Sequence, residues 1–169
     1  MGRGIRRVPP DWQHPKNEYD GFQPLFDRVF ERELKEWTEG QRRWDAGEDP
    51  ARAKYEAERG YSVAWEDWHG NPPDPAYHRP DWPEESRTAY QVYETVSEGT
   101  PISPVFPTEA DLLAWLTQPD GAPGMGIGGR KLVMDVETAR RFVAAAWAPS
   151  MVMQHGKMES GIAIHKDNP

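Results

Sequence analysis

One stretch constrains the fold more than any other: residues 90–116, with the sequence YQVYETVSEGTPISPVFPTEADLLAWL. Among its first residues, apolar side chains such as Tyr90 and Val92 occupy alternate positions, which is typical of a half-buried strand. Residues 97–101 then predict a turn, because Gly99 tolerates a positive φ and a proline closes the segment. Thr108 follows as a helix N-cap, with Asp111 three residues later as in a capping box. The stretch therefore predicts a strand, a loop and a capped helix in succession.

The composition limits what can stabilise such a fold. The 169 residues include no cysteine, which excludes disulfides, thiolate metal sites and cysteine nucleophiles and suits a reducing cytoplasm. Eight tryptophans stand among sparse aliphatic residues, so the core must depend on large aromatic rings. The net charge of −8 disfavours nonspecific nucleic-acid binding and permits a basic partner. No segment is apolar enough to predict a membrane span.

The pattern of prolines and glycines predicts one domain in four parts. These parts are an extended arm (1–23), a helical segment (24–60), a strap rich in proline and tryptophan (61–89) and an α+β core (90–164). We predict an α+β fold in which two or three helices pack on a small, mostly antiparallel sheet. Within the arm, Arg6-Arg7-Val8 predicts a short edge strand. Its arginines either contact an acidic partner or pair with an acidic helix of the chain itself.

Local signals place the remaining elements. Apolar spacing predicts a helix over 24–46, in which Gly40 marks a break or bend, and Asp49-Pro50 starts a second helix that ends at Gly60. A helix capped by Asp135 is predicted to end at the proline at 149. Strands are expected at 61–65 and 131–134, and residues 151–153 are expected to form a hairpin with 161–164. Four aromatic residues on helix faces are predicted to be buried: Trp37, Trp115, Phe142 and Trp147.

Two patterns resemble ligand sites. Residues 124–129 (GMGIGG) match the dinucleotide-binding glycine pattern, but they follow a loop rather than a strand, which favours a surface loop. The strap concentrates residue types that bind metals, at Asp67, His69, Asp74, His78 and Asp81. Their spacing places no pair of histidines on one helix face, so we predict no metal or cofactor there.

A recognition surface is expected at the central loop. The predicted protein-binding residues are Tyr93, Glu94, Ser97, Glu98, Thr100 and Asp111. Residues 90–121 carry five carboxylates and no lysine or arginine, which suits a basic partner. The same loop could instead be a rigid connection, and the basic arm or the strap could be the interface. Glu94 and Glu98 could also act as an acid–base pair, although no histidine is near them in sequence.

Three segments carry a resemblance to known proteins: GRGIRRVPPDWQHP, YQVYETVSEGTPISPVFPTEADLLAWL and ARRFVAAAWAPSMVM. In this order they are similar to a group of uncharacterised proteins encoded by bacteriophages and prophages. Longer members of that group carry Cys-x-x-Cys pairs between the first and central segments. This chain has the strap and no cysteine in that place, so a zinc role does not carry over. The resemblance implies a phage or prophage origin and no particular catalytic activity.

From these observations we expect an accessory protein that acts in the cytoplasm of a bacterial host. It would bind and inhibit a host protein that is basic or handles nucleic acid, as anti-CRISPR and host-takeover proteins do. Two alternatives are a virion or assembly component and a small enzyme that acts on a nucleotide signal. Direct nucleic-acid binding and membrane association are not expected.

Overall fold

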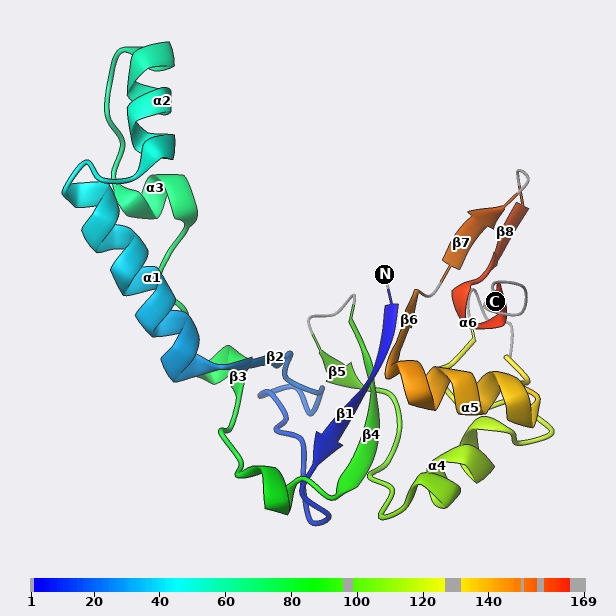
Figure 1. The fold of residues 1–169 in the computed structure, drawn as a ribbon. Helices are drawn as coiled ribbons and strands as arrows, with labels where there is room; N and C mark the ends of the chain where they lie inside the picture. The colour runs from blue at the N-terminus through cyan, green and yellow to red at the C-terminus, as the bar shows by residue number, and fades with distance from the viewer. Residues whose placement is uncertain (1, 96–98, 127–131, 150, 155–156, 165–169) are drawn as a thin grey trace. The chain divides into compact units, whose positions relative to one another are not determined.

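The computed structural model describes residues 2–95, 99–126, 132–149, 151–154 and 157–164 (Figure 1). The chain divides into two compact units. The first consists of Met1–Leu25 with Trp82–Pro169, and the second is Phe26–Asp81. The first unit contains a four-stranded antiparallel sheet with helices, so the predicted α+β fold with a small antiparallel sheet is confirmed. The organisation as one domain in four parts stays a prediction.

The sheet of the first unit has the strand order β5-β4-β1-β6. Its strands are β1 (Gly2–Val8), β4 (Ala89–Glu94), β5 (Thr100–Pro101) and β6 (Trp147–Pro149). Ile5 of β1 lies opposite Val92 of β4. Residues 6–8, which were predicted as a short edge strand, form the end of β1 and pair with β4, while β6 pairs only with residues 2–4 of the same strand. The side chain of Trp147 lies so close to Gly2 that a Cβ there would be 2.7 Å from the indole Nε1, which explains a glycine at this position.

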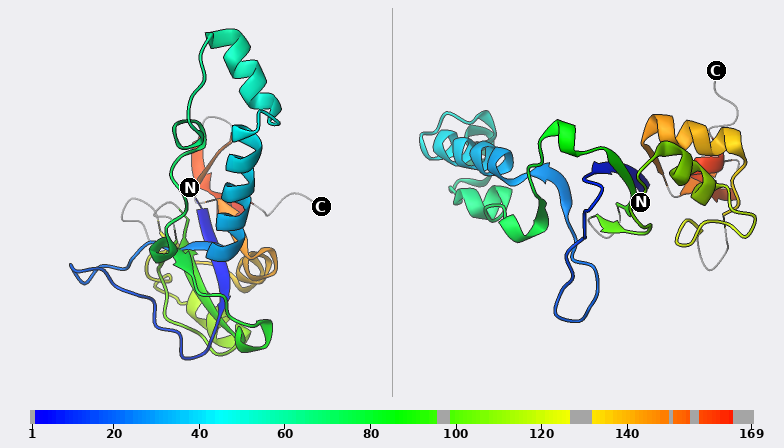
Figure 2. Two further views of the ribbon diagram at one scale, coloured as in Figure 1. Left: turned by 90° about the vertical axis from the view of Figure 1, so that its left-hand side faces the viewer. Right: turned by 90° about the horizontal axis from the view of Figure 1, so that it is seen from below.

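Two capped helices complete the core of the first unit. The first is α4 (Glu109–Leu116), whose N-cap Thr108 accepts a hydrogen bond from the Asp111 amide. The second is α5 (Val136–Ala145), whose N-cap Asp135 accepts a hydrogen bond from the Thr138 amide. The two helices pack against each other (Figure 2). The buried cluster between helices and sheet includes Val92, Phe106, Leu112, Trp115, Leu116 and Phe142. The predicted burial of Trp115 and Phe142 is thus confirmed.

The C-terminal part of this unit differs from the predicted pattern. Helix α5 ends because Ala146 adopts a left-handed conformation with φ of 55°, so Trp147 belongs to β6 and is 51% exposed rather than buried. The hairpin joins β7 (Met151–Gln154) to β8 (Lys157–Ser160), and Gly161–Ile164 forms the short helix α6 instead of a strand. Residues 132–134 are irregular, and residue 131 lies outside the described part. A short 3₁₀ turn, η2 (Glu84–Ser86), precedes β4.

The second unit is mainly helical. Its elements are β2 (Phe26–Val29), α1 (Phe30–Asp45), α2 (Pro50–Arg59), α3 (Trp65–His69), the 3₁₀ turn η1 (Pro75–Tyr77) and β3 (His78–Arg79). The first predicted helix begins late, at Phe30 instead of residue 24, because β2 pairs in parallel with β3. The predicted strand at 61–65 is also wrong, since Trp65 opens α3. Helix α2 follows the prediction, with Asp49 as its cap and a left-handed Gly60 at its end.

Aromatic rings form the interior of the second unit. Trp44 is 1% exposed and stacks on Trp68, with ring centroids 5.1 Å apart. Trp65 is 6% exposed, contacts Trp44, and stacks on His69 at 4.4 Å. Helix α1 continues through Gly40 without the expected break, and a Cβ at Gly40 would lie 2.5 Å from Cζ2 of Trp65. The glycine therefore lets α3 approach α1 closely.

Candidate functional site

The central residue of the predicted recognition surface lies in the interior. Tyr93 is 2% exposed on β4. Its hydroxyl donates to Gln91 Oε1 at 2.7 Å and accepts from Trp12 Nε1 at 3.2 Å, while the Arg6 guanidinium lies 4.1 Å from its ring centroid. These contacts hold the arm to the sheet, and whether Tyr93 also contacts a partner stays a prediction.

The other predicted contact residues divide between structural roles and undescribed positions. Glu94 accepts a hydrogen bond at 2.8 Å from Arg3, which is itself 5% exposed. Thr100 is half-buried in β5 opposite Glu94, and Asp111 accepts from the Thr108 hydroxyl at 2.6 Å at the start of α4. Ser97 and Glu98 lie outside the described residues. The structure thus brings Tyr93, Glu94 and Thr100 together on neighbouring strands, and whether these positions bind a protein stays a prediction.

The arginines of the N-terminal strand make contacts within the first unit. Arg7 donates to the main-chain oxygens of Arg87 and Thr88, and its guanidinium lies 4.2 Å from the ring centroid of Tyr90. Arg6 donates to the main-chain oxygen of Leu25 at 2.8 Å. These contacts match the expectation of a packed extension, although the partners are a strand and main-chain oxygens rather than an acidic helix.

Neither ligand pattern in the sequence forms a site among the described residues. Of the glycine pattern 124–129, only the first three residues are described, and the carbonyls of Gly124 and Gly126 accept hydrogen bonds from Arg3. In the strap, the described residues contain no group of three or more histidine, aspartate or glutamate side chains placed to hold a metal ion. His78 instead faces Glu33, as described below.

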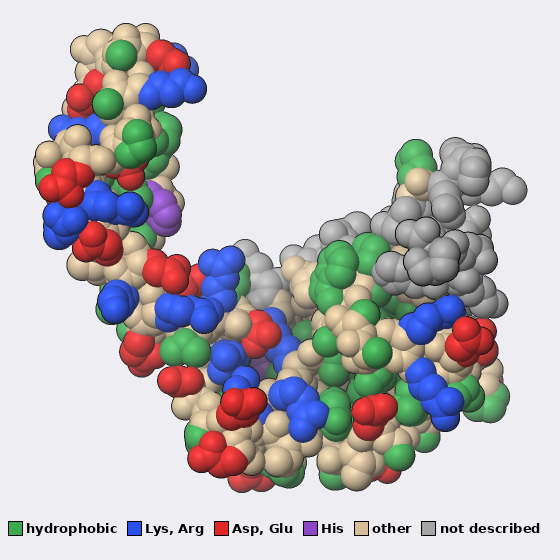
Figure 3. Space-filling model, viewed as in Figure 1, with side chains coloured by type: hydrophobic (Ala, Val, Ile, Leu, Met, Phe, Trp, Pro, Cys, Tyr) green, Lys and Arg blue, Asp and Glu red, His purple; other side chains and the backbone are tan. Residues whose placement is uncertain are grey.

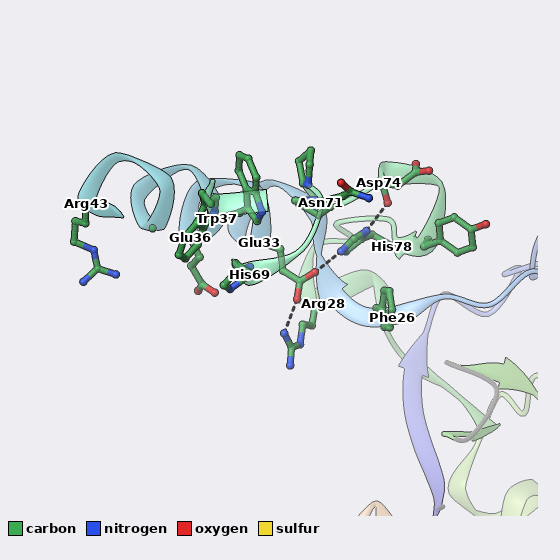
Figure 4. A pocket seen from close by; sticks show the side chains of 15 residues that line it. Phe26, Arg28, Glu33, Glu36, Trp37, Arg43, His69, Asn71, Asp74 and His78 are labelled. Atoms are coloured by element: carbon green, nitrogen blue, oxygen red, sulfur yellow. Dashed lines mark hydrogen bonds and ion pairs between the residues drawn. The ribbon is translucent and has the colours of Figure 1, made fainter. Parts of the chain in front are cut away.

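An open groove of about 480 Å³ lies within the second unit, between α1 and the strap (Figure 4). Helix α1 contributes one face, formed by Glu33, Glu36, Trp37, Gly40 and Arg43. These positions follow the spacing i, i+3, i+4, i+7 and i+10, so they share one side of a helix. The opposite wall comes from Trp65, His69, residues 71–74, Tyr77 and His78, and Phe26 and Arg28 of β2 complete the lining.

One end of the groove is closed by a chain of polar contacts. His78 Nδ1 lies 2.7 Å from the main-chain oxygen of Asp74, and Nε2 contacts the carboxylate of Glu33. Arg28 donates to the other oxygen of that carboxylate at 2.6 Å. Burial by itself would raise the pKa of Glu33, but the hydrogen bonds and charges of His78 and Arg28 outweigh it and hold the pKa below its usual value. Glu33 is therefore an ionised, fully engaged carboxylate.

The rest of the groove combines aromatic rings with two available charges. Trp37 is half-buried and donates to the main-chain oxygen of Gly70 at 3.1 Å, and the Trp65–His69 stack lies beside it. Glu36 and Arg43 are exposed, and neither side chain makes a hydrogen bond or ion pair with a described residue. The hydrogen bond from Arg42 lowers the pKa of Glu39, and the charge of Arg43 adds a smaller contribution in the same direction.

Sequence patterns alone did not predict this groove. They predict the apolar stripe of α1 and place Glu36 and Arg43 on its solvent side. The available signal was Gly40 inside that stripe, combined with a tryptophan-rich strap further along the chain, because a helical glycine often marks a close approach of another element.

The fold and the groove define an α+β protein with an additional helical unit built around aromatic rings. Comparisons with protein-family models, with curated proteins and with solved structures find no match to this chain. Among the described residues, no helix combines the length and apolar character needed to cross a membrane.

Proposed function

We propose that this protein is a phage- or prophage-encoded accessory protein that binds and inhibits a host protein in the bacterial cytoplasm, by protein contact rather than catalysis. The observation that carries the proposal is the groove of the second unit. It exposes parts of Trp37 and Tyr77 together with Arg28 and Arg43. Tryptophan, tyrosine and arginine are enriched among the few residues that supply most of the binding energy at protein interfaces. A target in antiviral defence, as for anti-CRISPR proteins, fits the resemblance to phage proteins.

The chemistry of the groove favours binding over catalysis. A general base must be free to take a proton from its substrate. Both ring nitrogens of His78 face oxygen acceptors, and both oxygens of Glu33 accept hydrogen bonds. His78 and Glu33 therefore stabilise the unit and are not left free for proton transfer.

The charge of the chain supports a basic target. Residues 26–81 contain fourteen carboxylates against nine lysines and arginines. Positive and negative side chains are interspersed along α1 (Figure 3), so the excess of negative charge acts as a field over the unit rather than as one acidic patch. Such a field speeds the approach of a positively charged protein, including one that handles nucleic acid.

The test is recovery of the target followed by a direct assay. The tagged full chain is expressed in a bacterial host, and bound proteins are identified and purified. Trp37→Ser should weaken binding of the recovered protein at least tenfold, because it removes an aromatic contact from the groove. Trp147→Ser is the matched control, since Trp147 is a half-exposed tryptophan of the first unit. Circular dichroism checks that both variants fold.

Inhibition is measured by titrating the chain into the target's own assay. A target that keeps full activity when saturated would contradict the inhibitor function. Equal binding of wild type and Trp37→Ser would exclude the groove as the contact site. Recovery of the chain mainly in purified virions would favour the alternative of an assembly component.

A further inference from the structure

We infer that the groove binds an extended segment of its partner that carries one cationic side chain and one carboxylate three residues apart, with a proline or aromatic residue between them. This inference rests on the proposed function and specifies the chemistry that the partner must present. It follows from three features of the groove: which charges are available, how far apart they lie, and what lines the space between them.

Part of the charge of the groove is already paired, since Glu33 is bound by Arg28 and His78. The Asp74 carboxylate accepts only the neutral Ala76 amide and so keeps its negative charge on the facing wall. On α1, the side chains of Glu36 and Arg43 remain exposed without a hydrogen bond or ion pair among the described residues. A ligand that lies along α1 therefore meets one free negative and one free positive charge, and opposite charges on the ligand would complement both.

The spacing of these two residues sets the spacing on the ligand. Glu36 and Arg43 are seven residues apart on α1, which places them about 10.5 Å apart along the helix axis. Figure 4 shows Arg43 at the end of the groove that lies away from His78, with Glu36 between them. A peptide in the polyproline II conformation advances about 3.1 Å per residue with three residues per turn, so residues i and i+3 lie on the same side about 9 Å apart and can match both charges.

The lining between the charges favours flat and rigid groups. Trp37 contacts Trp65, with ring centroids 6.4 Å apart, and Trp65 stacks on His69 with an interplanar angle of 20°. Pro72 and Pro73 form part of the facing wall. Aromatic surfaces of this kind bind proline-containing extended segments, whose conformation is already restricted before binding. A proline or aromatic residue between the two charges fits this lining.

The test uses three fluorescently labelled peptides and the full chain. Their sequences are Lys-Pro-Phe-Glu, Lys-Pro-Phe-Lys and Glu-Pro-Phe-Glu, each with blocked ends, and dissociation constants come from fluorescence anisotropy. The wild-type protein should bind the mixed-charge peptide about fivefold more tightly than either like-charge peptide, as partly exposed ion pairs allow.

Charge reversal should change this preference rather than abolish binding. Glu36→Arg places two cations in the groove and should prefer Glu-Pro-Phe-Glu, while Arg43→Glu should prefer Lys-Pro-Phe-Lys, each by about fivefold. Glu31→Arg and Lys35→Glu are matched controls, because these residues lie on α1 outside the groove and make the same changes in net charge. A new preference in a variant is a gain that misfolding cannot produce.

Three results would overturn the inference. The first is equal binding of the three peptides by the wild type, and the second is the same change of preference in a control as in its groove counterpart. The third is self-association of the chain that Glu36→Arg abolishes in the absence of peptide binding, since the occupant would then be a second copy. None of these results depends on a host target, so the recovery experiment decides separately whether the protein inhibits a host protein.

Discussion

At the scale of single residues, Gly40 shows how packing reverses an intrinsic preference. Glycine inside a helix costs about 1 kcal/mol relative to alanine, so its presence in α1 predicts a weak point or a bend. The helix is instead continuous, and Trp65 of α3 occupies the space that a side chain at Gly40 would need. Gly40 therefore lowers the intrinsic stability of α1 as a helix, but it makes room for Trp65 in the aromatic interior of the second unit.

This leads to a prediction for Gly40→Ala. Although alanine favours helix, the added methyl group would overlap Trp65, so the free energy of unfolding should fall by about 1–3 kcal/mol. Urea denaturation followed by tryptophan fluorescence measures the change. Thr38→Ala, two residues away and exposed, is the control and should alter stability by no more than about 0.5 kcal/mol. A more stable Gly40→Ala protein would show that α3 does not pack on α1 in this way.

His14 gives the chain a pH dependence with a definite sign. Burial lowers the pKa of His14 from its usual 6.5, the hydrogen bond to the Gln23 carbonyl partly opposes this shift, and the charge of Arg6 adds to it. The unfolded chain therefore takes up the proton first as pH falls. The stability that His14 contributes is complete above about pH 6.5 and is lost as pH falls through the lowered pKa of the folded state.

We therefore expect wild-type protein to unfold at lower urea concentration at pH 5.5 than at pH 7.5. His14→Gln should be less stable at both values, because it loses the contacts to Gln23 and Phe22, but its stability should change less between them. An unchanged difference in His14→Gln would assign the pH dependence to other groups.

At the scale of elements, the starts of three helices with side-chain caps were predictable and the strand partners were not. Thr108, Asp135 and Asp49 cap helices because a short polar side chain satisfies a free amide in the first turn, which is a local property of the sequence. The pairing of β1 with β4 joins residues more than eighty positions apart, and no local periodicity encodes it. For the same reason the groove, which joins α1 to the strap, could not be predicted from either segment alone.

The end of α5 provides a test at this scale. Because Ala146 turns the chain before Trp147, Phe142 is the last large side chain that α5 buries. Phe142→Ala should lower the free energy of unfolding by about 3–5 kcal/mol, and Trp147→Ala by only about 1 kcal/mol because half of its surface is already exposed. Thermal and urea denaturation of both variants show which substitution causes the larger loss of stability. Equal losses would mean that the helix extends to Trp147 after all.

At the scale of the whole molecule, the negative charge is the property that most affects an encounter with a partner. Reversal of Asp111 would be a poor test of its role, because this carboxylate also accepts the hydroxyl of the α4 cap, and its loss would disturb the helix. Glu109 and Asp120 are exposed and make no hydrogen bond or ion pair with a described residue. They can be reversed with less effect on the fold.

The last prediction concerns the kinetics of binding to the recovered host protein. If the field of the chain steers association, Glu109→Lys with Asp120→Lys should slow association severalfold and leave dissociation nearly unchanged, because exposed charges at a distance act mainly on the encounter. Raising the salt concentration from 50 to 300 mM should slow the wild type in the same way. Exchanging Glu109 and Arg140, two exposed residues that line one surface hollow, keeps the net charge and should leave the association rate unchanged. If neither the salt concentration nor the double charge reversal changes the association rate, the negative charge does not steer this encounter. The rate would then depend on the contacts of the interface alone.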